Sequence, residues 1–358
     1  MATDTAPPPA PAKKADERVR EVGRLSKVLT RPELGAVAGV FLVYSFFAIM
    51  AYENNFISWL TTAAILNRAA PLGILAAAVS LLIIGGEFDL SIGSLVGFAG
   101  MSIMVLVFPS DAGGFGWSLW PAIFVALLIA IASGAFNGML VVTTKLPSFI
   151  ITLATLFIFR GLTIALTRLR TNRTQLGNLD EVGGFSLADT LFASEIHLFG
   201  AKFRVSILWW IGLTVLATWV LLRTRPGNWI FGSGGDANAA RNQGVPVNRT
   251  KVALFITTAC AAWLVAVVQV VQFTGADTLR GTLQEFYAII AVVIGGTLLT
   301  GGYGSAIGAF FGALIFAMVQ QGIIITGVDG DWFRVFVGVV LVVAVVFNQY
   351  VRQKAAQR

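Results

Sequence analysis

The chain has 358 residues, of which 56% are hydrophobic and 12% are charged, and its net charge is +7. Its mean hydropathy of +0.81 is too high for a water-soluble fold of this length and indicates a polytopic membrane protein. The Lys and Arg residues gather in particular stretches between apolar segments, as the positive-inside rule describes, which argues against nucleic-acid binding. The single cysteine, Cys260, lies in an apolar run and excludes an internal disulfide.

Both ends of the chain are polar and basic. Residues 1–32 combine a Pro-rich stretch with a series of Lys and Arg residues. We therefore predict a cytoplasmic tail over 1–32, disordered in its Pro-rich part and basic in the rest. A transmembrane domain is expected over 33–350, and a second cytoplasmic tail over 351–358.

The apolar segments between these tails predict an all-α fold of about ten transmembrane helices, some of them broken. In chain order we expect them at 34–52, 56–84, 90–108, 119–142, 147–166, 205–222, 252–273, 287–299, 305–325 and 332–347. The second segment is interrupted by Asn67, Arg68 and Pro71, so we expect either a re-entrant half-helix or, preferably, a broken helix. An even number of crossings places both termini in the cytoplasm. The long polar connection over 167–204 then lies outside, although its cations favour the inside.

The stretch from Gly85 to Met101 places two carboxylates, Glu87 and Asp89, between two strongly apolar segments. A charge at this depth in a membrane is costly and usually functional. Asp89 stands where the N-cap of the following helix is expected. We therefore predict that this stretch is the hinge of a broken helix whose N-terminus faces a polar cavity.

Two further features surround this hinge. Gly93 and Gly97 form a Gly-x-x-x-Gly face on which another helix can approach closely. Arg160, in the fifth apolar segment, is either the ion-pair partner of Asp89 or extends to the outer surface, and we favour the second.

A second glycine-rich break follows the eighth apolar segment. The order Gly295-Gly296 and then Gly304-Ser305 resembles the order Gly85-Gly86 and then Gly93-Ser94. This similarity indicates either a duplicated hinge or two breaks that arose independently. The predicted hinge glycines are Gly85, Gly86, Gly295, Gly296, Gly301 and Gly302.

The basic loop over residues 223–251 is predicted to lie in the cytoplasm. Within it, Asp236 is placed to cap a two-turn helix that Gly244 ends. Such a helix is too short to be stable alone, so we expect a partner surface to hold it. Ala239 and Ala240 are small enough to enter a groove on that partner, and Arg241 can pair with an acidic residue there. The alternative is a solvated connector.

Catalytic motifs are absent from the sequence. No lysine is followed by Ser or Thr, so the phosphate-binding loop of ATPases cannot form. The single histidine, His197, excludes a His-Glu-x-x-His metal site and falls in the long polar connection, where a surface role is expected. We therefore predict neither enzymatic activity nor a metal site.

Several motifs occur in a fixed order along the chain. They are the hinge over 85–94, Gly-x-x-Asn-Gly over 134–138, Leu-Pro-Ser-Phe-Ile-Ile-Thr-Leu over 146–153, Phe-Arg-Gly over 159–161, Gly-Gly-x-x-x-Ala-Ala-Arg-x-x-Gly-Val over 234–245, and Gly-Gly-Thr-x-x-x-Gly-Gly-x-Gly-Ser over 295–305. In these motifs the chain resembles the permease subunits of bacterial ribose/xylose-type ABC importers from about residue 35 onward. It departs from them at Gly-Gly-Glu-Phe-Asp, one residue longer than the commoner Gly-Gly-Ile-Asp, and at Asp236-Ala237, where Asn-Pro is frequent.

The resemblance implies a homodimer of permeases in the bacterial inner membrane, with separate ATP-binding subunits and a periplasmic sugar-binding protein as partners. ATP and Mg²⁺ would be bound by the partner subunit, and this chain would hold no cofactor. The helix between Asp236 and Gly244 would transmit closure of the ATPase to the hinges. The longer hinge puts the family's substrate assignment in question.

A sugar requires several hydrogen-bond partners and tolerates few fixed charges. The candidates for the substrate pathway are Glu87, Asp89, Ser91, Asn137, Thr152 and Gln269. Hydrogen bonding between neighbouring helices is the alternative for Ser91, Asn137 and Thr152, and capping is the alternative for Asp89. A second hypothesis is an ion-coupled secondary transporter of a small polar solute. Broken helices and buried carboxylates suit it equally, but it does not require a docking helix in the basic loop.

Overall fold

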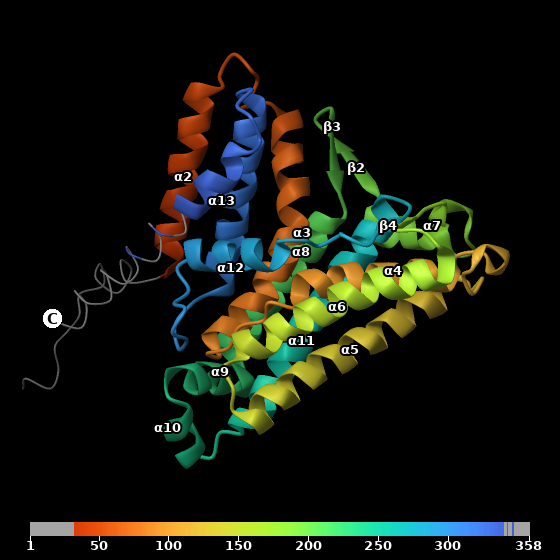
Figure 1. Ribbon diagram of the computed structural model, residues 1–358. Coiled ribbons are helices and arrows are strands. Elements are labelled where there is room, and N and C mark those ends of the chain that lie inside the picture. Colours follow the sequence, from red (N-terminus) through yellow and green to blue (C-terminus); the bar gives the residue numbers. More distant parts are fainter. Residues whose placement is uncertain (1–31, 340–341, 343–345, 347–358) are drawn as a thin grey trace, which may run out of the picture.

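The computed structural model describes residues 32–339 together with 342 and 346 (Figure 1). The two predicted tails, apart from Pro32, and much of the last predicted segment therefore lie outside the described residues. A helix over 332–339 begins that last segment.

Most described residues are helical, as predicted. Seven helices are long and apolar enough to span a membrane: α2 (Pro32–Met50), α3 (Trp59–Ile84), α5 (Leu119–Thr144), α6 (Ser148–Thr171), α8 (Ser206–Arg223), α11 (Val247–Gln272) and α13 (Ala306–Ile325). Two apolar helices are shorter, α4 (Ile92–Val107) and α12 (Gln284–Ile294). The 11 residues of α12 rise about 16 Å, roughly half the thickness of a bilayer core. The all-α membrane fold is confirmed, whereas the count of ten crossings is not.

The predicted break in the second segment is wrong, because α3 is one continuous helix of 26 residues. Ser58 caps it by accepting a hydrogen bond from the Thr61 N–H at 3.2 Å. Pro71 lies inside the helix, and the Trp210 ring packs directly on nearby Gly73. Helix α3 is largely buried, and this tertiary packing outweighs the roughly 3 kcal/mol by which proline disfavours a helix interior.

Asn67 shows why the polar residues of α3 do not interrupt it. Its side-chain amide donates to the Lys202 carbonyl and accepts from the Arg204 N–H, both at 2.8 Å. These two partners belong to a hairpin of strands β2 (Glu195–Leu198) and β3 (Ala201–Arg204). The polar interruption in the sequence is therefore an attachment point for the long connection.

Helix α6 extends to Thr171, into the predicted 167–204 connection, and the rest of that connection consists of short elements. They are β1 (Gln175–Leu176), η2 (Leu179–Glu181), α7 (Phe185–Ala188) and η3 (Asp189–Ala193), and another short turn, η1 (Ser110–Ala112), follows α4. Strand β1 pairs antiparallel with β4 (Ala276–Asp277), which ties this connection to the segment before α12.

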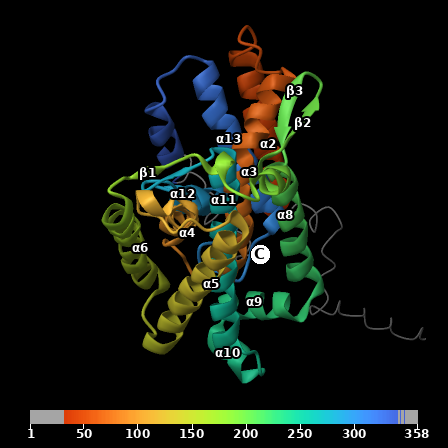
Figure 2. The same cartoon turned by 90° about the vertical axis from the view of Figure 1, so that its right-hand side faces the viewer.

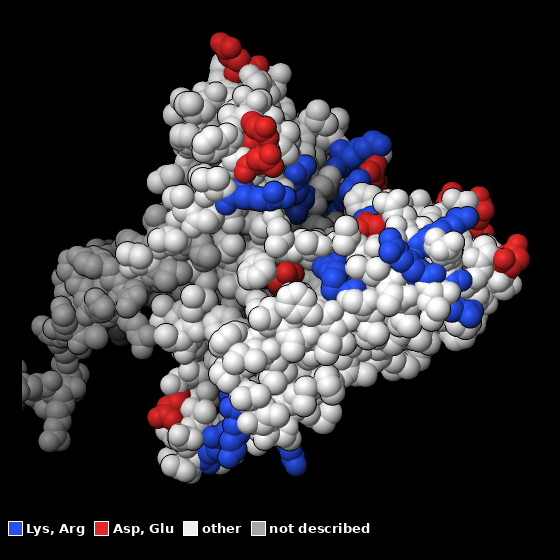
Figure 3. All heavy atoms as spheres, in the orientation of Figure 1, with Lys and Arg blue, Asp and Glu red and all other residues white. Residues whose placement is uncertain are grey.

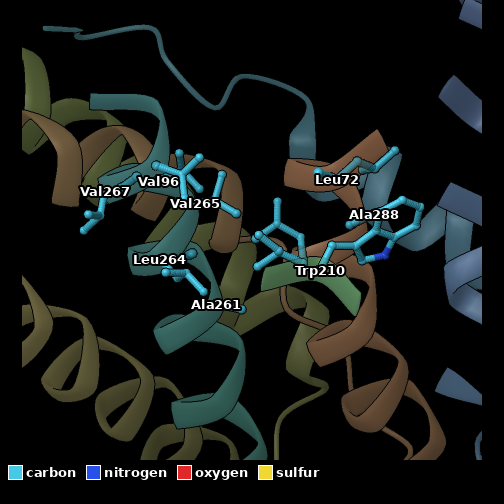
Figure 4. Packing of buried hydrophobic residues seen from close by; sticks show 14 of the residues in the cluster. Leu72, Val96, Trp210, Ala261, Leu264, Val265, Val267 and Ala288 are labelled. Atoms are coloured by element: carbon cyan, nitrogen blue, oxygen red, sulfur yellow. The ribbon is translucent and has the colours of Figure 1, made fainter. Parts of the chain in front are cut away.

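Helices α3 and α11 form the centre of the protein, and both are largely buried by their neighbours. Figure 4 shows their contact region, where Trp210 of α8 lies beside Leu72 and Ala288, and Leu264 and Val265 point from α11. Helices α2 and α13 stand beside the first half of α3, while α4 and α5 pack on α11 and α6 packs on α4 (Figures 1 and 2).

The β2–β3 hairpin and the pair α9 (Arg225–Gly235) and α10 (Ala237–Asn242) lie at opposite ends of the protein in both views (Figures 1 and 2). We refer to these as the hairpin end and the α10 end. Figure 3 shows charged side chains toward both ends and a broad uncharged band along α5. This distribution is that of a protein whose middle lies in hydrocarbon.

Candidate functional site

The two predicted hinges end their helices in the same way. Gly86 and Gly296 adopt the left-handed conformation, with φ of 84° and 88°. Their N–H groups donate to Ile83 and Val293, three residues back, at 2.9 Å in both cases. The next N–H groups donate five residues back, Glu87 to Leu82 at 3.1 Å and Thr297 to Val292 at 3.2 Å. Both breaks are therefore Schellman motifs, which explains why each has a glycine pair.

The two hinges also touch each other. The Gly302 N–H donates to the Ile84 carbonyl at 2.8 Å, so the loop before α13 folds onto the end of α3. A Cβ added to Gly301 would lie 2.9 Å from the Gly86 Cα atom. Of the predicted hinge glycines, Gly86, Gly301 and Gly302 thus lie together, while Gly85 and Gly295 are the helix C-caps.

Helix α9 adds a third glycine segment to this contact. A Cβ on Gly234 would lie 1.8 Å from the Ile84 carbonyl oxygen and 2.7 Å from the Gly302 nitrogen. We call Gly86, Gly234, Gly301 and Gly302 the glycine junction. Sequence reasoning missed Gly234, although Thr224 before Arg225-Pro226 is a standard signal for the start of such a helix.

The short helix predicted in the basic loop is confirmed as α10. Asp236 caps it by accepting hydrogen bonds from the N–H groups of Asn238 at 2.9 Å and Ala239 at 3.0 Å. Gly244 ends it, with φ of 81° and an N–H bond to the Arg241 carbonyl at 2.9 Å.

One of the two alanines of α10 that were predicted to contact a partner is buried within this chain. Ala240 is buried against Gly232 of α9, so it packs inside the chain and does not present a free surface. Ala239 and Arg241 are exposed. The Arg241 guanidinium donates to the Asn238 side chain at 3.1 Å, which holds it on the exposed face.

Asp89 is the centre of a buried polar cluster. Its Oδ1 atom accepts hydrogen bonds from the Ser91 N–H at 2.9 Å and the Ser91 hydroxyl at 2.6 Å, and Oδ2 accepts from the Thr258 hydroxyl at 2.7 Å. The Asn137 amide donates to the Ser91 hydroxyl at 2.9 Å. All four side chains are at most 2% exposed, and the Asn137 Oδ1 atom has no partner among the described residues.

The predicted capping role of Asp89 is wrong. Ser91 is the N-cap of α4, and it makes no side-chain capping bond. Asp89 instead bonds the N–H two residues ahead, which forms a turn before the helix begins. Thr258 was missed because nothing distinguishes a threonine that supports this cluster from others in an apolar helix.

The other three pathway candidates form no hydrogen bond with the four side chains of this cluster. Glu87 forms an ion pair with Lys251 at the α10 end. The Thr152 hydroxyl donates to the Ser148 carbonyl at 2.8 Å, within α6, and also reaches the carbonyl of Phe88, the residue before Asp89, at 3.5 Å. Gln269 lies about 16 Å along α11 from Thr258, and its Oε1 atom is buried without a partner among the described residues. Thr152 therefore lies beside the Asp89 cluster, whereas Gln269 lies far from it along α11.

Neither expectation for Arg160 matches the structure. Its guanidinium donates to the carbonyls of Thr278 at 3.2 Å and Arg280 at 2.9 Å, rather than pairing with Asp89 or extending outward. The same turn approaches the small face of α4: a Cβ on Gly93 would lie 2.5 Å from the Gly281 carbonyl oxygen. The close approach predicted for this face occurs, and both this turn and the first turn of α12 make it, since the same Cβ would lie 1.8 Å from the Glu285 carboxylate.

Comparisons with known proteins agree with this architecture. Residues 61–345 match the family described as branched-chain amino acid transport system / permease component. The chain is 31% identical over 288 residues to the ribose import permease protein RbsC of Escherichia coli (strain K12), which covers 79% of this chain and 84% of the relative. It is 30% identical over 314 residues, or 87% and 90% of the two chains, to the inner membrane ABC transporter permease protein YjfF of the same strain. The xylose transport system permease protein XylH is 28% identical over 89% and 92% of the two chains. No solved structure matches the chain.

Proposed function

Because the chain belongs to the permease component family of branched-chain amino acid and related transport systems, we propose that it forms the membrane-spanning subunit of an ATP-driven monosaccharide importer. The observation that carries this proposal is the likeness to ribose and xylose permeases over at least 79% of this chain. The position of α10 at one end, in contact with α9 and through it with both hinges, supports it physically.

The coupling route starts at the exposed side of α10. A separate ATP-binding subunit docks on Ala239 and Arg241, and movement of α10 shifts α9 because Ala240 packs on Gly232. Helix α9 ends at the glycine junction, where backbone atoms are in direct contact and no side chain lies between them. Displacement of α9 therefore moves the end of α3 together with the loop between α12 and α13, and these hinges change the tilt of α4 and α13.

The assembly that we propose contains two copies of this chain, ATP-binding subunits at the α10 end and a periplasmic sugar-binding protein at the hairpin end. The α10 end and both termini then lie in the cytoplasm. The cationic residues near α9 and α10 agree with this orientation. ATP and Mg²⁺ are bound by the partner subunit alone.

The Asp89 cluster supplies the polar groups that a sugar needs. Its hydroxyl, amide and carboxylate groups are at present satisfied by one another, except for the Asn137 Oδ1 atom. Opening of the hinge separates α4 from α5 and α11 and frees these groups for sugar hydroxyls. Glu87, Thr152 and Gln269 remain candidate contacts at other levels of the pathway.

Reconstitution tests the proposal. The permease, its ATP-binding subunit and its binding protein are placed in proteoliposomes, and uptake of labelled ribose, xylose and fructose is compared with uptake of leucine and valine. We expect ATP-dependent accumulation of a monosaccharide. ATP-dependent accumulation of an amino acid alone would overturn the cargo, and accumulation driven by an ion gradient without the ATP-binding subunit would show a secondary transporter instead.

A further inference from the structure

An apolar groove lies between α3, α8, α9 and α11. Its volume is about 690 Å³, within the range of about 300–1,000 Å³ typical of ligand sites. Its walls include Leu81, Leu216, Ile230 and Leu254. We call it the α8–α11 groove.

The α8–α11 groove is unsuited to a sugar. Apart from Arg249, its polar lining is limited to side chains such as Thr250, Thr257 and Cys260. No residue of the Asp89 cluster lines it. A sugar placed there would lose hydrogen bonds to water without replacing them, which is unfavourable for each of its hydroxyl groups. The lining of the groove therefore favours an apolar ligand.

The shape of the groove suits an acyl chain. It follows α11 from Arg249 to Leu264, a rise of about 22 Å, which exceeds the roughly 15 Å of hydrocarbon in one leaflet. Trp229 of α9 lines the end near Arg249, and tryptophan favours the headgroup level of a membrane. A chain that enters at this end can lie along α11 as far as the middle of the bilayer.

The groove also has a free cation at its mouth. Arg249 is exposed and forms no ion pair or side-chain hydrogen bond with any of the described residues. Arg225, the first residue of α9, is likewise exposed, and Pro226 beside it lines the groove. A basic mouth on a long apolar groove complements a lipid with an anionic headgroup.

We propose that the α8–α11 groove binds an anionic phospholipid of the cytoplasmic leaflet, with its phosphate at Arg249 and an acyl chain along α11. The choice of leaflet rests on the proposed function, which places the α10 end in the cytoplasm. The lipid would hold α9 against α8 and α11, and α9 is the helix that ends at the glycine junction. A lipid in the groove would then change how far a displacement of α10 is transmitted through α9 to the hinges.

Native mass spectrometry of the full chain tests the site. The protein is purified without its partners, exchanged into equal amounts of phosphatidylglycerol and phosphatidylcholine, and the retained lipid is identified. We expect about a fivefold preference for phosphatidylglycerol, the factor that corresponds to about 1 kcal/mol for one basic residue at an anionic surface. Arg249→Gln should abolish this preference. Lys145→Gln, which removes another exposed cation at the α10 end but outside the groove, should retain it.

Cys260 provides a second readout, because it lines the groove and is the single cysteine of the chain. Alkylation of Cys260 by a membrane-permeant maleimide should be several-fold slower in nanodiscs with phosphatidylglycerol than in phosphatidylcholine alone, and Thr257→Trp, which fills the groove, should remove that difference. Equal retention of both lipids, or an unchanged preference in Arg249→Gln, would overturn the proposal. Cross-linking of Cys260 between two copies by a bismaleimide would also overturn it, by showing that a second chain fills the groove. None of these measurements uses cargo or ATP, so failure of the proposed function leaves them interpretable.

Discussion

The carboxylate of Glu87 forms an ion pair with the ammonium group of Lys251. Glu87 directly follows the glycine pair that ends α3, whereas Lys251 lies near the start of α11, where the loop over 223–251 ends. Their side chains are 8% and 18% exposed, so water screens the pair only weakly. One ion pair thus joins the first hinge to the beginning of α11, the helix that follows α10, in parallel with the glycine junction.

Neutralising one partner of this pair should be worse than neutralising both. Glu87→Gln leaves the Lys251 charge largely buried without a counter-charge, and breaking a buried pair in this way costs up to about 3–5 kcal/mol. The double variant Glu87→Gln/Lys251→Met removes both charges and should recover most of the stability. Thermal unfolding in detergent and import in proteoliposomes measure the two effects. If the double variant loses the sum of the two single losses, the pair does not couple the residues.

Gly234→Ala should separate α9 from the hinges. The added Cβ would lie 1.8 Å from the Ile84 carbonyl oxygen, and overpacking of this kind costs about 1–3 kcal/mol. Gly235→Ala is the matched control, because its Cβ would meet nothing within 4 Å and both positions belong to α9. We expect import to fall sharply in Gly234→Ala and to persist in Gly235→Ala, while both proteins insert and bind the ATP-binding subunit. Equal import by the two variants would remove the glycine junction from the coupling route.

Substitutions at Asp89 should separate hydrogen bonding from charge. In Asp89→Asn the amide oxygen can still accept from Ser91, and Thr258 can turn its hydroxyl toward the Phe255 carbonyl, which it already contacts at 2.9 Å. Asp89→Leu leaves the Ser91 N–H and hydroxyl without their acceptor, at about 1–3 kcal/mol for each buried group. Unfolding temperature and import should therefore decrease moderately in the first variant and severely in the second. Equal losses would mean that the charge itself is essential.

The features predicted correctly from the sequence depend on local rules. Asp236 and Gly244 bound α10 because a cap and a left-handed glycine act on the residues beside them. Gly85 and Gly295 end their helices for the same reason. The apolar segments gave the helical membrane fold, since their lengths depend on the thickness of the bilayer.

The features that the sequence did not predict depend on distant partners. Pro71 is a local helix breaker, yet Trp210, far along the chain, packs on Gly73 beside it and α3 remains continuous. Glu87 is a candidate substrate contact in the sequence, but in the fold its carboxylate pairs with Lys251, far along the chain. Gly234 gave no signal of its own, because only the fold brings it to Ile84. Local sequence patterns do not specify such pairings between residues that are far apart in the chain.

The two alanines of α10 should respond differently to enlargement. Ala239→Trp places a large ring on the exposed face, where it should obstruct the ATP-binding subunit without changing the unfolding temperature of the isolated permease. Ala240→Trp instead inserts the ring between α10 and Gly232 of α9, so it should lower the unfolding temperature as well. Co-purification with the ATP-binding subunit and thermal unfolding distinguish the two. Arg241→Glu should weaken co-purification alone, and undiminished co-purification of both Ala239→Trp and Arg241→Glu would exclude this face as the docking surface.

The β2–β3 hairpin should lose stability in acid because of Glu195. Lys202 lies 3.0 Å from its carboxylate, and this hydrogen bond holds the pKa of Glu195 below its ordinary value of 4.5. A carboxyl group with a lowered pKa stabilises the folded state above its ordinary pKa, and that contribution disappears as the pH falls through the lowered value. Since Lys202 is 64% exposed, we expect a loss below about 1 kcal/mol.

Amide hydrogen exchange in the hairpin, corrected for the intrinsic effect of pH, measures this loss. In the wild-type chain, protection of residues 195–204 should decrease once the pH falls below 4.5, the ordinary pKa of Glu195. In Glu195→Gln the protection should be lower at neutral pH and independent of pH over the same range. The bonds from Asn67 to Lys202 and Arg204 do not titrate, so they should keep part of the protection in both proteins. The same pH dependence in both proteins would show that another group controls the hairpin.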